Sequence, residues 1–356
     1  MPSNLLFESE IKPQNIDNLI DDPFALCFYL LVCYEEYLPF AKDTYGRFSY
    51  QAFSLKEKVK LTEPLIDNFA FSLFEQLKNK FPSLKKRERK FQFINTIDID
   101  HAWLYKNKLF WKNAGSLAKK IMKFQWKSAV FQMKVIINQE DDPYFIYPYI
   151  QSLPFSSIFF ISFGKKGKLD TNHCPNNKKY RNLIKNIQNT SKFKLGLHPS
   201  YRSNFDVKIL QEEKSNLENL MEEKIFRSRQ HFIMVNLPKT YKNLLYLDIK
   251  EDFSMGFQDF AGFRAGTCTP FYWFDLEENK ISDLKVYPFC MMDVTLKNYM
   301  QLSEKEAEKT VSALIDSVKK VNGTFISIFH NDSLSDFGEW NGWKSLYENL
   351  ITKIND

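Results

Sequence analysis

Two acidic residues in this sequence have the type and spacing that metal-assisted hydrolysis needs. Asp98 and Asp100 close a run of apolar residues, and residues two apart in a strand face the same side. Two carboxylates on one side repel each other unless a cation or a proton lies between them. One of them could therefore ligate a metal while the other acts as a general base. The alternative interpretation is that Asp100 caps a helix, or that both residues are solvated in a loop.

Three histidines have comparable positions along the chain. His198 ends an apolar run and precedes a proline, which makes it a candidate zinc ligand. His330 also ends an apolar run and is a candidate general acid, oriented by Asp332 or another carboxylate. His231 is a candidate metal ligand or substrate contact. For each histidine the alternative is a structural role, with its hydrogen bonds satisfied inside the fold.

Two arginines and one further acid complete the candidate set. Arg229 and Arg264 could each orient a carboxylate by bidentate pairing, or could instead form a surface ion pair. Asp170 opens a polar loop, residues 170–176, that follows the second predicted strand and could therefore reach the site.

Short strands that alternate with helices must position these residues. Apolar and β-rich runs predict strands over residues 91–97, 156–163, 193–197, 231–235 and 324–329. Helices are predicted over 207–224 and from a capping box at Ser303 and Glu306 onward. This alternation favours a parallel sheet or a (β/α) barrel, whose active sites lie at the carboxyl ends of the strands.

The first 88 residues show a different pattern and are predicted to be mainly helical. Asp22 and Pro23 indicate a helix start, and a second helix is predicted over residues 65–80. A basic run at 85–90 marks the boundary. We therefore expect an α-rich accessory domain over residues 1–88 and an α/β barrel over residues 89–356.

Composition excludes several classes of protein. The 356 residues are 44% hydrophobic and 26% charged, as in an ordinary globular protein. The net charge is +6, but no nucleic-acid motif accompanies the basic run, so no nucleic-acid partner is expected. Five cysteines without a CxxC pair argue against disulfides and against a cysteine zinc site. Residues 1–14 show no export signal, and the apolar stretch 24–34 is too short to span a bilayer, so we expect a cytoplasmic protein without a transmembrane segment.

The order of these motifs resembles the NodB-homology polysaccharide deacetylases, carbohydrate esterase family 4. The resemblance is carried by the motifs around Asp98 and Asp100, by 159–164, by 195–198 and by the last strand ending in His330. Four further segments resemble a Bacteroidetes-type subgroup with an extra N-terminal domain of unknown function: residues 22–25, 34–38, 262–267 and 292–296. The resemblance implies a distorted (β/α) barrel.

The resemblance also implies a reaction and a role for each residue. It implies a carbohydrate deacetylase, a hydrolase of amide C–N bonds, that uses a divalent metal, usually zinc, to remove an N-acetyl group from a sugar or glycan precursor. Asp98 would be the base, Asp100 and His198 metal ligands, and His330 the acid. Arg229 would steady the base, with Arg264 as its competitor.

One position departs from the family pattern. The second metal histidine normally falls four residues after the first, where this chain has Arg202. His231 could supply the missing ligand, or the metal could be weakly bound or absent. In the latter case the chain would be a catalytically inactive carbohydrate-binding protein on a deacetylase fold. In either case Asp170, Arg202 and Trp103 are candidate carbohydrate contacts, the tryptophan by stacking on a sugar ring. The sequence leaves the oligomeric state open.

Overall fold

The computed structural model describes residues 21–108 and 110–356. The accessory domain expected from residue 1 therefore begins outside the described residues. The segment 1–14, on which the expectation of no export signal rests, also lies outside them. In the described part, no helix combines the length and the apolar composition needed to cross a membrane.

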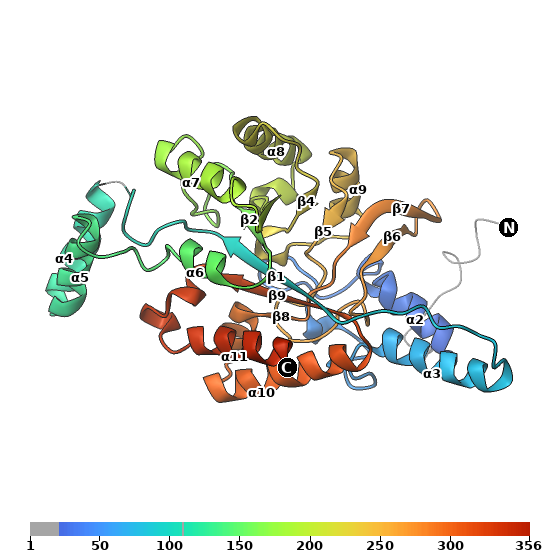
Figure 1. Cartoon of the computed structure of the whole chain (residues 1–356). Coiled ribbons are helices and arrows are strands. Elements are labelled where there is room, and N and C mark those ends of the chain that lie inside the picture. Colours follow the sequence, from blue (N-terminus) through green and yellow to red (C-terminus); the bar gives the residue numbers. More distant parts are fainter. Residues whose placement is uncertain (1–20, 109) are drawn as a thin grey trace.

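Two helices dominate the described part of the N-terminal region, α2 (Pro23–Leu31) and α3 (Leu65–Lys80). The predicted start of α2 is confirmed, because Asp22 Oδ1 accepts the N–H groups of Phe24 at 2.9 Å and Ala25 at 3.1 Å. The predicted range of α3 is confirmed as well. Both helices lie at one end of the molecule (Figure 1).

Nine strands of the described residues form a single sheet in the order β6-β7-β5-β4-β3-β2-β1-β9-β8. All neighbouring strands are parallel except β6 and β7. The strands are β1 (Gln92–Ile99), β2 (Ser157–Ile161), β3 (Phe193–Leu197), β4 (Arg227–Ser228), β5 (Glu251–Asp252), β6 (Phe271–Asp275), β7 (Lys280–Val286), β8 (Met291–Met292) and β9 (Thr324–His330). The central parallel strands are continuous apolar runs in the sequence because both faces of the sheet are covered. Strand β2, in which every residue is buried, is an example.

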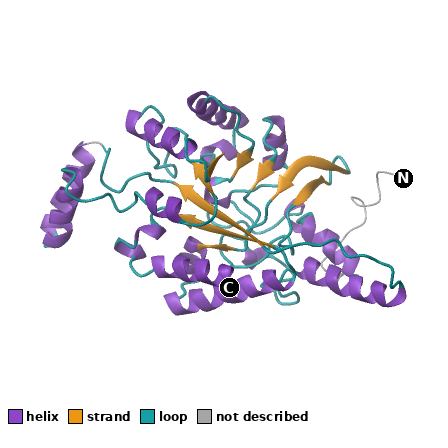
Figure 2. Cartoon of the chain, in the orientation of Figure 1, coloured by secondary structure: helices purple, strands orange, loops and turns teal. Residues whose placement is uncertain are grey.

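Most of the remaining helices pack around this sheet, and α4 and α5 project away from it, as Figure 1 and Figure 2 show. The remaining helices are α4 (Phe110–Met122), α5 (Trp126–Ile136), α6 (Tyr147–Ser152), α7 (Lys178–Gln188), α8 (Val207–Met221), α9 (Lys239–Tyr246), α10 (Glu304–Lys320) and α11 (Lys344–Asn355). The capping box predicted at the start of α10 is present, with Ser303 and Glu306 bonded reciprocally. The mixed α/β class is thus confirmed.

No pairing between the two edge strands, which would close the sheet into a barrel, occurs within the described residues. The two edge strands of the sheet are β6 and β8. One backbone hydrogen bond, from Phe289 N before β8 to Met255 O after β5, crosses the opening at 2.9 Å. The barrel therefore stays a prediction.

The predicted strand over residues 231–235 is wrong. The strand that follows β3 is the short β4, and His231–Ile233 form a 3₁₀ turn instead. Phe232 and Ile233 have φ values of 61° and 52°, in the left-handed region that bulky residues rarely adopt. An apolar run does not reveal such a turn, since side-chain pattern alone cannot separate it from a strand.

Candidate metal centre

The carboxyl end of β1 presents the first two candidate residues. Asp98 lies in β1 between Phe160 of β2 and His330 of β9, and it is buried. Arg229 is also buried and donates from Nη1 to Asp98 Oδ1 at 2.9 Å. The same guanidinium donates from Nε to Phe253 O at 3.0 Å, which fixes its plane. The fixed guanidinium of Arg229 therefore sets the orientation of the Asp98 carboxylate.

Asp100 faces two histidines, His198 directly after β3 and His231 in the turn after β4. His198 Nε2 lies 3.3 Å from Asp100 Oδ1, and His231 Nε2 lies 3.5 Å from Asp100 Oδ2. One potential ligand atom from each of these three residues falls within 4.8 Å of the other two. The structure thus brings together a possible three-residue metal site that the separate motifs only suggested.

The second nitrogen of each imidazole is already engaged. His198 Nδ1 lies 2.7 Å from Arg229 O, and a carbonyl oxygen can only accept, so Nδ1 carries the proton. His231 Nδ1 lies 3.1 Å from Asp170 Oδ1. Such partners fix the ring orientation and tautomer of metal-binding histidines. Both Nε2 atoms are therefore directed at Asp100.

The electrostatics of the three residues fit a divalent cation. Burial raises the pKa of Asp100, but the imidazoles of His231 and His198 outweigh burial and hold it well below its usual value. Burial lowers the pKa of His231, but Asp100 and Asp170 outweigh it and raise that pKa to about 9. Asp100 Oδ1 and His198 Nε2 are buried and make no hydrogen bond within the described residues. Two imidazoles and a carboxylate form a donor set that suits zinc and similar ions.

His330 stands beside this trio with its own carboxylate. Its Nδ1 lies 2.8 Å from Asp293 Oδ1, and its Nε2 lies 4.0 Å from Asp100 Oδ2. Asp332 instead accepts from the N–H of Ser333 at 2.8 Å. The carboxylate that orients His330 is thus Asp293, a residue to which no role was assigned from the sequence. Its place in the 292–296 motif was the signal that could have identified it.

These side chains open into one cavity of about 140 Å³. Asp98, Asp100, His198, His231 and His330 all line it. The other lining residues are Arg47, Gln230, Phe232, Ile233, Met292, Val294 and Tyr299. The cavity wall therefore includes a residue from the N-terminal region, Arg47, that sequence reasoning missed.

Arg47 is buried and holds the turn that carries His231. It donates from Nη1 to Phe232 O at 2.6 Å and from Nη2 to Tyr299 Oη at 2.9 Å. Its Nε donates to Asp43 Oδ2 at 2.7 Å, so its charge is balanced within its own segment. No pattern in the sequence around residue 47 indicates these distant contacts.

Five of the candidate residues lie outside the cavity lining: Arg229, which contacts Asp98 from behind, and four that do not contact it. Arg202 is 41% exposed, donates to Lys165 O at 3.0 Å and has its Nε 3.8 Å from Asp170 Oδ2. Asp170 is buried behind His231 and also accepts from Tyr201 N at 2.7 Å. Trp103 is buried and packs edge-on against His173. The roles proposed for these residues as carbohydrate contacts stay predictions.

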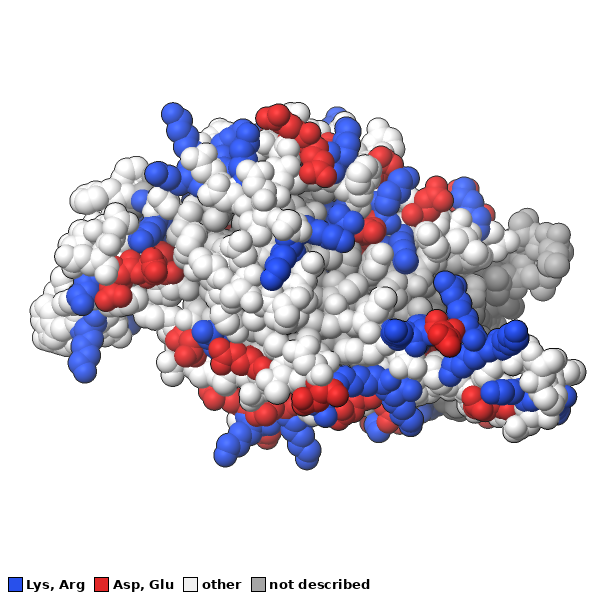
Figure 3. Space-filling view, in the orientation of Figure 1, with Lys and Arg blue, Asp and Glu red and all other residues white. Residues whose placement is uncertain are grey.

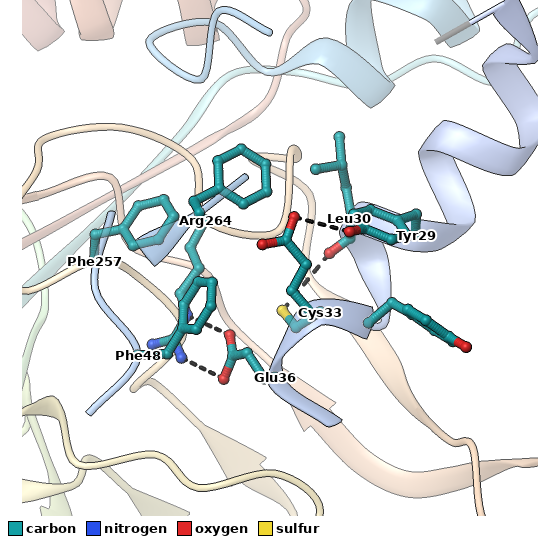
Figure 4. Close-up of a pocket in the computed structure, with 10 residues that line it drawn as sticks. Tyr29, Leu30, Cys33, Glu36, Phe48, Phe257 and Arg264 are labelled. Carbon is teal, nitrogen blue, oxygen red and sulfur yellow. Dashed lines mark hydrogen bonds and ion pairs between the residues drawn. The ribbon is translucent and has the colours of Figure 1, made fainter. Parts of the chain in front are cut away.

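Arg264 is the fourth, and it belongs to a different part of the molecule (Figure 4). Its Nε and Nη2 donate to Glu36 at 2.9 and 2.6 Å, and its Nη1 donates to Gly256 O at 3.1 Å. The guanidinium therefore binds a carboxylate in a bidentate manner, as the sequence suggested for Arg229 and Arg264 alike, but the carboxylate comes from the N-terminal region. Of the two arginines, Arg229 is the one that contacts Asp98.

Comparison with known proteins gives limited guidance. Residues 2–82 match the model of a family of unknown function (DUF7033), which covers less than a quarter of the chain. No curated protein matches the sequence.

Several solved structures are similar in fold. A putative polysaccharide deacetylase from Mycobacterium smegmatis is 12% identical, with a TM-score of 0.46 over 76% of this chain and 86% of that one. A 4-alpha-glucanotransferase from Thermococcus litoralis is 13% identical, with a TM-score of 0.42 over 75% of this chain and 38% of that one. A polysaccharide deacetylase from Bacillus cereus is 9% identical, with a TM-score of 0.30 over 75% of this chain and 88% of that one. All three TM-scores are low, so the activity has to be argued from the residues of this chain.

Proposed function

We propose that this chain is a divalent-metal-dependent hydrolase that removes an N-acetyl group from a sugar or glycan precursor. One observation carries the proposal: a carboxylate fixed by an arginine lies beside a group of one aspartate and two histidines, and a further histidine with its own carboxylate faces the same cavity. The class of substrate is supported by the motif order that resembles the NodB-homology deacetylases. In this proposal residues 1–88 are an accessory domain and residues 89–356 carry the reaction.

Asp100, His198 and His231 would hold the metal. When bound there, a zinc or similar ion would polarise the acetyl carbonyl and lower the pKa of water. The protein contributes the fixed directions of the two imidazoles, through Arg229 O for His198 and through Asp170 for His231. This support limits the reorganisation needed on metal binding.

Asp98 is proposed to take the proton of the attacking water. Its Oδ1 is held by Arg229, while its Oδ2 lies 3.9 Å from His198 Nε2, next to the proposed metal ligands. A base works only within hydrogen-bond reach of the proton it abstracts, and this oxygen lies on the side of the metal site. Arg229 therefore acts by presenting the free oxygen of Asp98.

His330 is proposed to protonate the leaving amine. Burial lowers its pKa, but Asp293, followed by Asp100 and Asp98, outweighs burial and raises the pKa well above the usual value for histidine. This shift favours the charged imidazole, the form that has a proton to give. Its Nδ1 is committed to Asp293, so the proton that can be delivered is the one on Nε2.

The rival proposal of an inactive carbohydrate-binding protein rested on Arg202. Arg202 does not line the cavity and lies behind Asp170, separated from Asp100 by the ring of His231. A guanidinium in that position leaves the three proposed ligands available. The observation that motivated the rival proposal therefore does not favour it.

The test combines metal content with acetate release. Purified protein should contain about one zinc or similar ion per chain, measured by elemental mass spectrometry. It should release acetate from at least one member of a panel of N-acetylated monosaccharides, nucleotide sugars, oligosaccharides and lipid-linked sugars. Removal of the metal by a chelator should abolish release, and added metal should restore it. A metal-loaded protein that binds these sugars without releasing acetate would refute the proposal.

A further inference from the structure

Helices α4 and α5 form a hairpin that projects from the body of the molecule (Figure 1). The hairpin follows the carboxyl end of β1, the same sheet edge that carries Asp98 and Asp100. Three residues, 123–125, connect its two helices. The hairpin therefore stands at the edge of the sheet where the cavity opens.

The seam between the two helices contains a cluster of polar side chains. Gln132 of α5 is fully buried, and its Oε1 accepts from Lys120 at 2.8 Å and from Ser116 at 3.2 Å. Its Nε2 donates to Asn113 O at 3.1 Å. A helical hairpin in a globular protein normally buries its apolar stripe and exposes its polar one. Here the buried Gln132 and its polar partners share the seam with Ala129 and Val135, which are also buried.

Most of the large apolar side chains of the hairpin lie on its outside. Five of the largest are more than half exposed, including Phe124 in the connection and Trp126 directly after it. Their exposed fractions are 82% for Phe110, 68% for Trp111, 78% for Met122, 79% for Phe124 and 56% for Trp126. Val130, Met133 and Ile137 of the second helix and its end are exposed as well. Large apolar side chains that gather on one exposed element indicate an interaction surface, whereas scattered single residues would need no explanation.

The same segment carries a one-sided charge. Residues 101–139 contain eight lysines and no aspartate, glutamate or arginine. Five of these lysines are exposed on the hairpin: Lys112, Lys119, Lys123, Lys127 and Lys134. Figure 3 shows basic side chains on this projecting part of the surface, with acidic side chains beside them and much of the rest uncharged. Acidic residues resume only at Glu140, directly after the hairpin, where Lys134 contacts Glu140 at 3.7 Å.

We propose that the α4–α5 hairpin docks on an anionic lipid surface. Exposed tryptophan and phenylalanine beside lysine are the composition of helices that lie in the boundary between lipid headgroups and acyl chains. Aromatic rings favour that boundary, and lysines next to it are attracted to anionic headgroups. A second copy of the chain is a poor partner, because two hairpins with this many lysines and no acids repel each other. The proposal does not depend on the activity proposed above.

The tryptophans make this proposal directly measurable. The chain has six tryptophans, and only Trp111 and Trp126 are exposed; the other four are at most 6% exposed. Full-length protein should co-sediment with phosphatidylcholine vesicles that contain phosphatidylglycerol, and not with phosphatidylcholine alone. Brominated acyl chains in the anionic vesicles should quench the fluorescence of these two tryptophans. No binding to anionic vesicles, or binding without quenching, would overturn the proposal.

Variants separate the apolar and electrostatic parts. Phe110→Ser with Phe124→Ser keeps both tryptophans and should weaken vesicle binding at least about tenfold. Lys112→Gln, Lys119→Gln and Lys123→Gln together should weaken it by roughly a hundredfold, at about fivefold per lysine. The matched controls are Tyr272→Ser with Ile281→Ser, and Lys305→Gln with Lys309→Gln and Lys320→Gln, all exposed residues elsewhere.

Each control has a defined outcome. The control variants should bind vesicles like the wild-type protein, and circular dichroism should show that every variant is folded. Folded hairpin variants that bind as well as the controls do would place the lipid contact elsewhere and overturn the proposal. A dimer in light scattering that the phenylalanine variant abolishes would assign the surface to a second copy instead.

Discussion

Arg264 and Arg229 are both buried arginines that pair with a buried carboxylate, yet their surroundings differ. Around Arg264, both oxygens of Glu36 accept from the guanidinium, and the remaining nitrogen donates to Gly256 O. Around Arg229, the guanidinium Nη2 makes no hydrogen bond within the described residues. The polar atoms around Arg264 therefore find their hydrogen-bond partners within the chain, whereas those around Arg229 do not all find one among the described residues.

Neighbouring residues extend this difference. Near Arg264, Asp67 of α3 accepts four hydrogen bonds, from Thr267, Cys268, Thr269 and Arg89. Near Arg229, two more buried polar atoms, Asp100 Oδ1 and His198 Nε2, make no hydrogen bond. Unsatisfied buried polar atoms cost free energy, so a fold that retains several of them at and beside one cavity has a reason other than stability. The Arg264 group fastens the N-terminal region to the sheet, whereas the Arg229 group is suited to bind something outside the chain.

The largest expected effect is on turnover, in Asp98→Asn. The variant keeps the shape of the side chain and removes the proposed base, so acetate release should fall about a thousandfold. The metal content should stay unchanged, because Asp98 is outside the proposed ligand set. Asp316→Asn, at an exposed carboxylate of α10, is the control and should be fully active. An Asp98→Asn protein within tenfold of wild-type activity would contradict the assignment of the base.

The next effect is on stability, in Glu36→Gln. This change leaves the Arg264 guanidinium buried without a counter-charge, which should lower the free energy of unfolding by about 3–5 kcal/mol. Glu63→Gln removes an exposed ion pair with Lys60 and should cost less than about 1 kcal/mol. Both are measured by denaturant unfolding. Equal losses in the two variants would mean that the buried pair does not fasten the two regions together.

Sequence patterns predict the local parts of this arrangement, but they do not predict contacts between residues far apart in the chain. Asp98, Asp100, His198 and His330 end apolar runs, and the rule that parallel strands present their carboxyl ends together was enough to group them. The choice between Arg229 and Arg264 could not be made in that way. Both stand in motif-like contexts, and only the fold shows that one faces Asp98 and the other Glu36.

Backbone conformation was the second limit. His231 was considered as a metal ligand but was assigned to a strand, because its apolar neighbours suggested one. The turn that in fact directs it toward Asp100 contains two non-glycine residues with positive φ, a conformation set by tertiary contacts. The contact from Arg47 is of the same kind, since it joins residues 185 positions apart.

A moderate effect is expected on metal affinity, in Asp170→Asn. Asp170 directs the His231 ring, and loss of such a partner typically weakens metal binding about 10–100-fold. Arg202→Gln is the matched control, because Arg202 approaches the other oxygen of Asp170 from the exposed side at 3.8 Å. It should change the affinity by less than about threefold. Calorimetric titration of the metal-free proteins with zinc measures both. Similar affinities in Asp170→Asn and wild type would show that His231 needs no orienting carboxylate, or is no ligand.

The smallest effect should come from the N-terminal region, in Arg47→Gln. Arg47 holds the carbonyl of Phe232 inside the turn that carries His231, so its loss should loosen the ring and weaken zinc binding by about tenfold. A single ammonium cannot replace three directed N–H groups, so Arg47→Lys should recover only part of the affinity. Arg227→Gln is the control. It breaks the ion pair between Arg227 of β4 and Glu251 of β5, and it should leave metal binding unchanged. The visible spectrum of the cobalt-loaded protein gives a second readout, because it reports ligand geometry and does not depend on turnover. If Arg47→Gln lowers the unfolding free energy while its zinc affinity and cobalt spectrum match those of the wild type, the N-terminal region stabilises the fold without shaping the site.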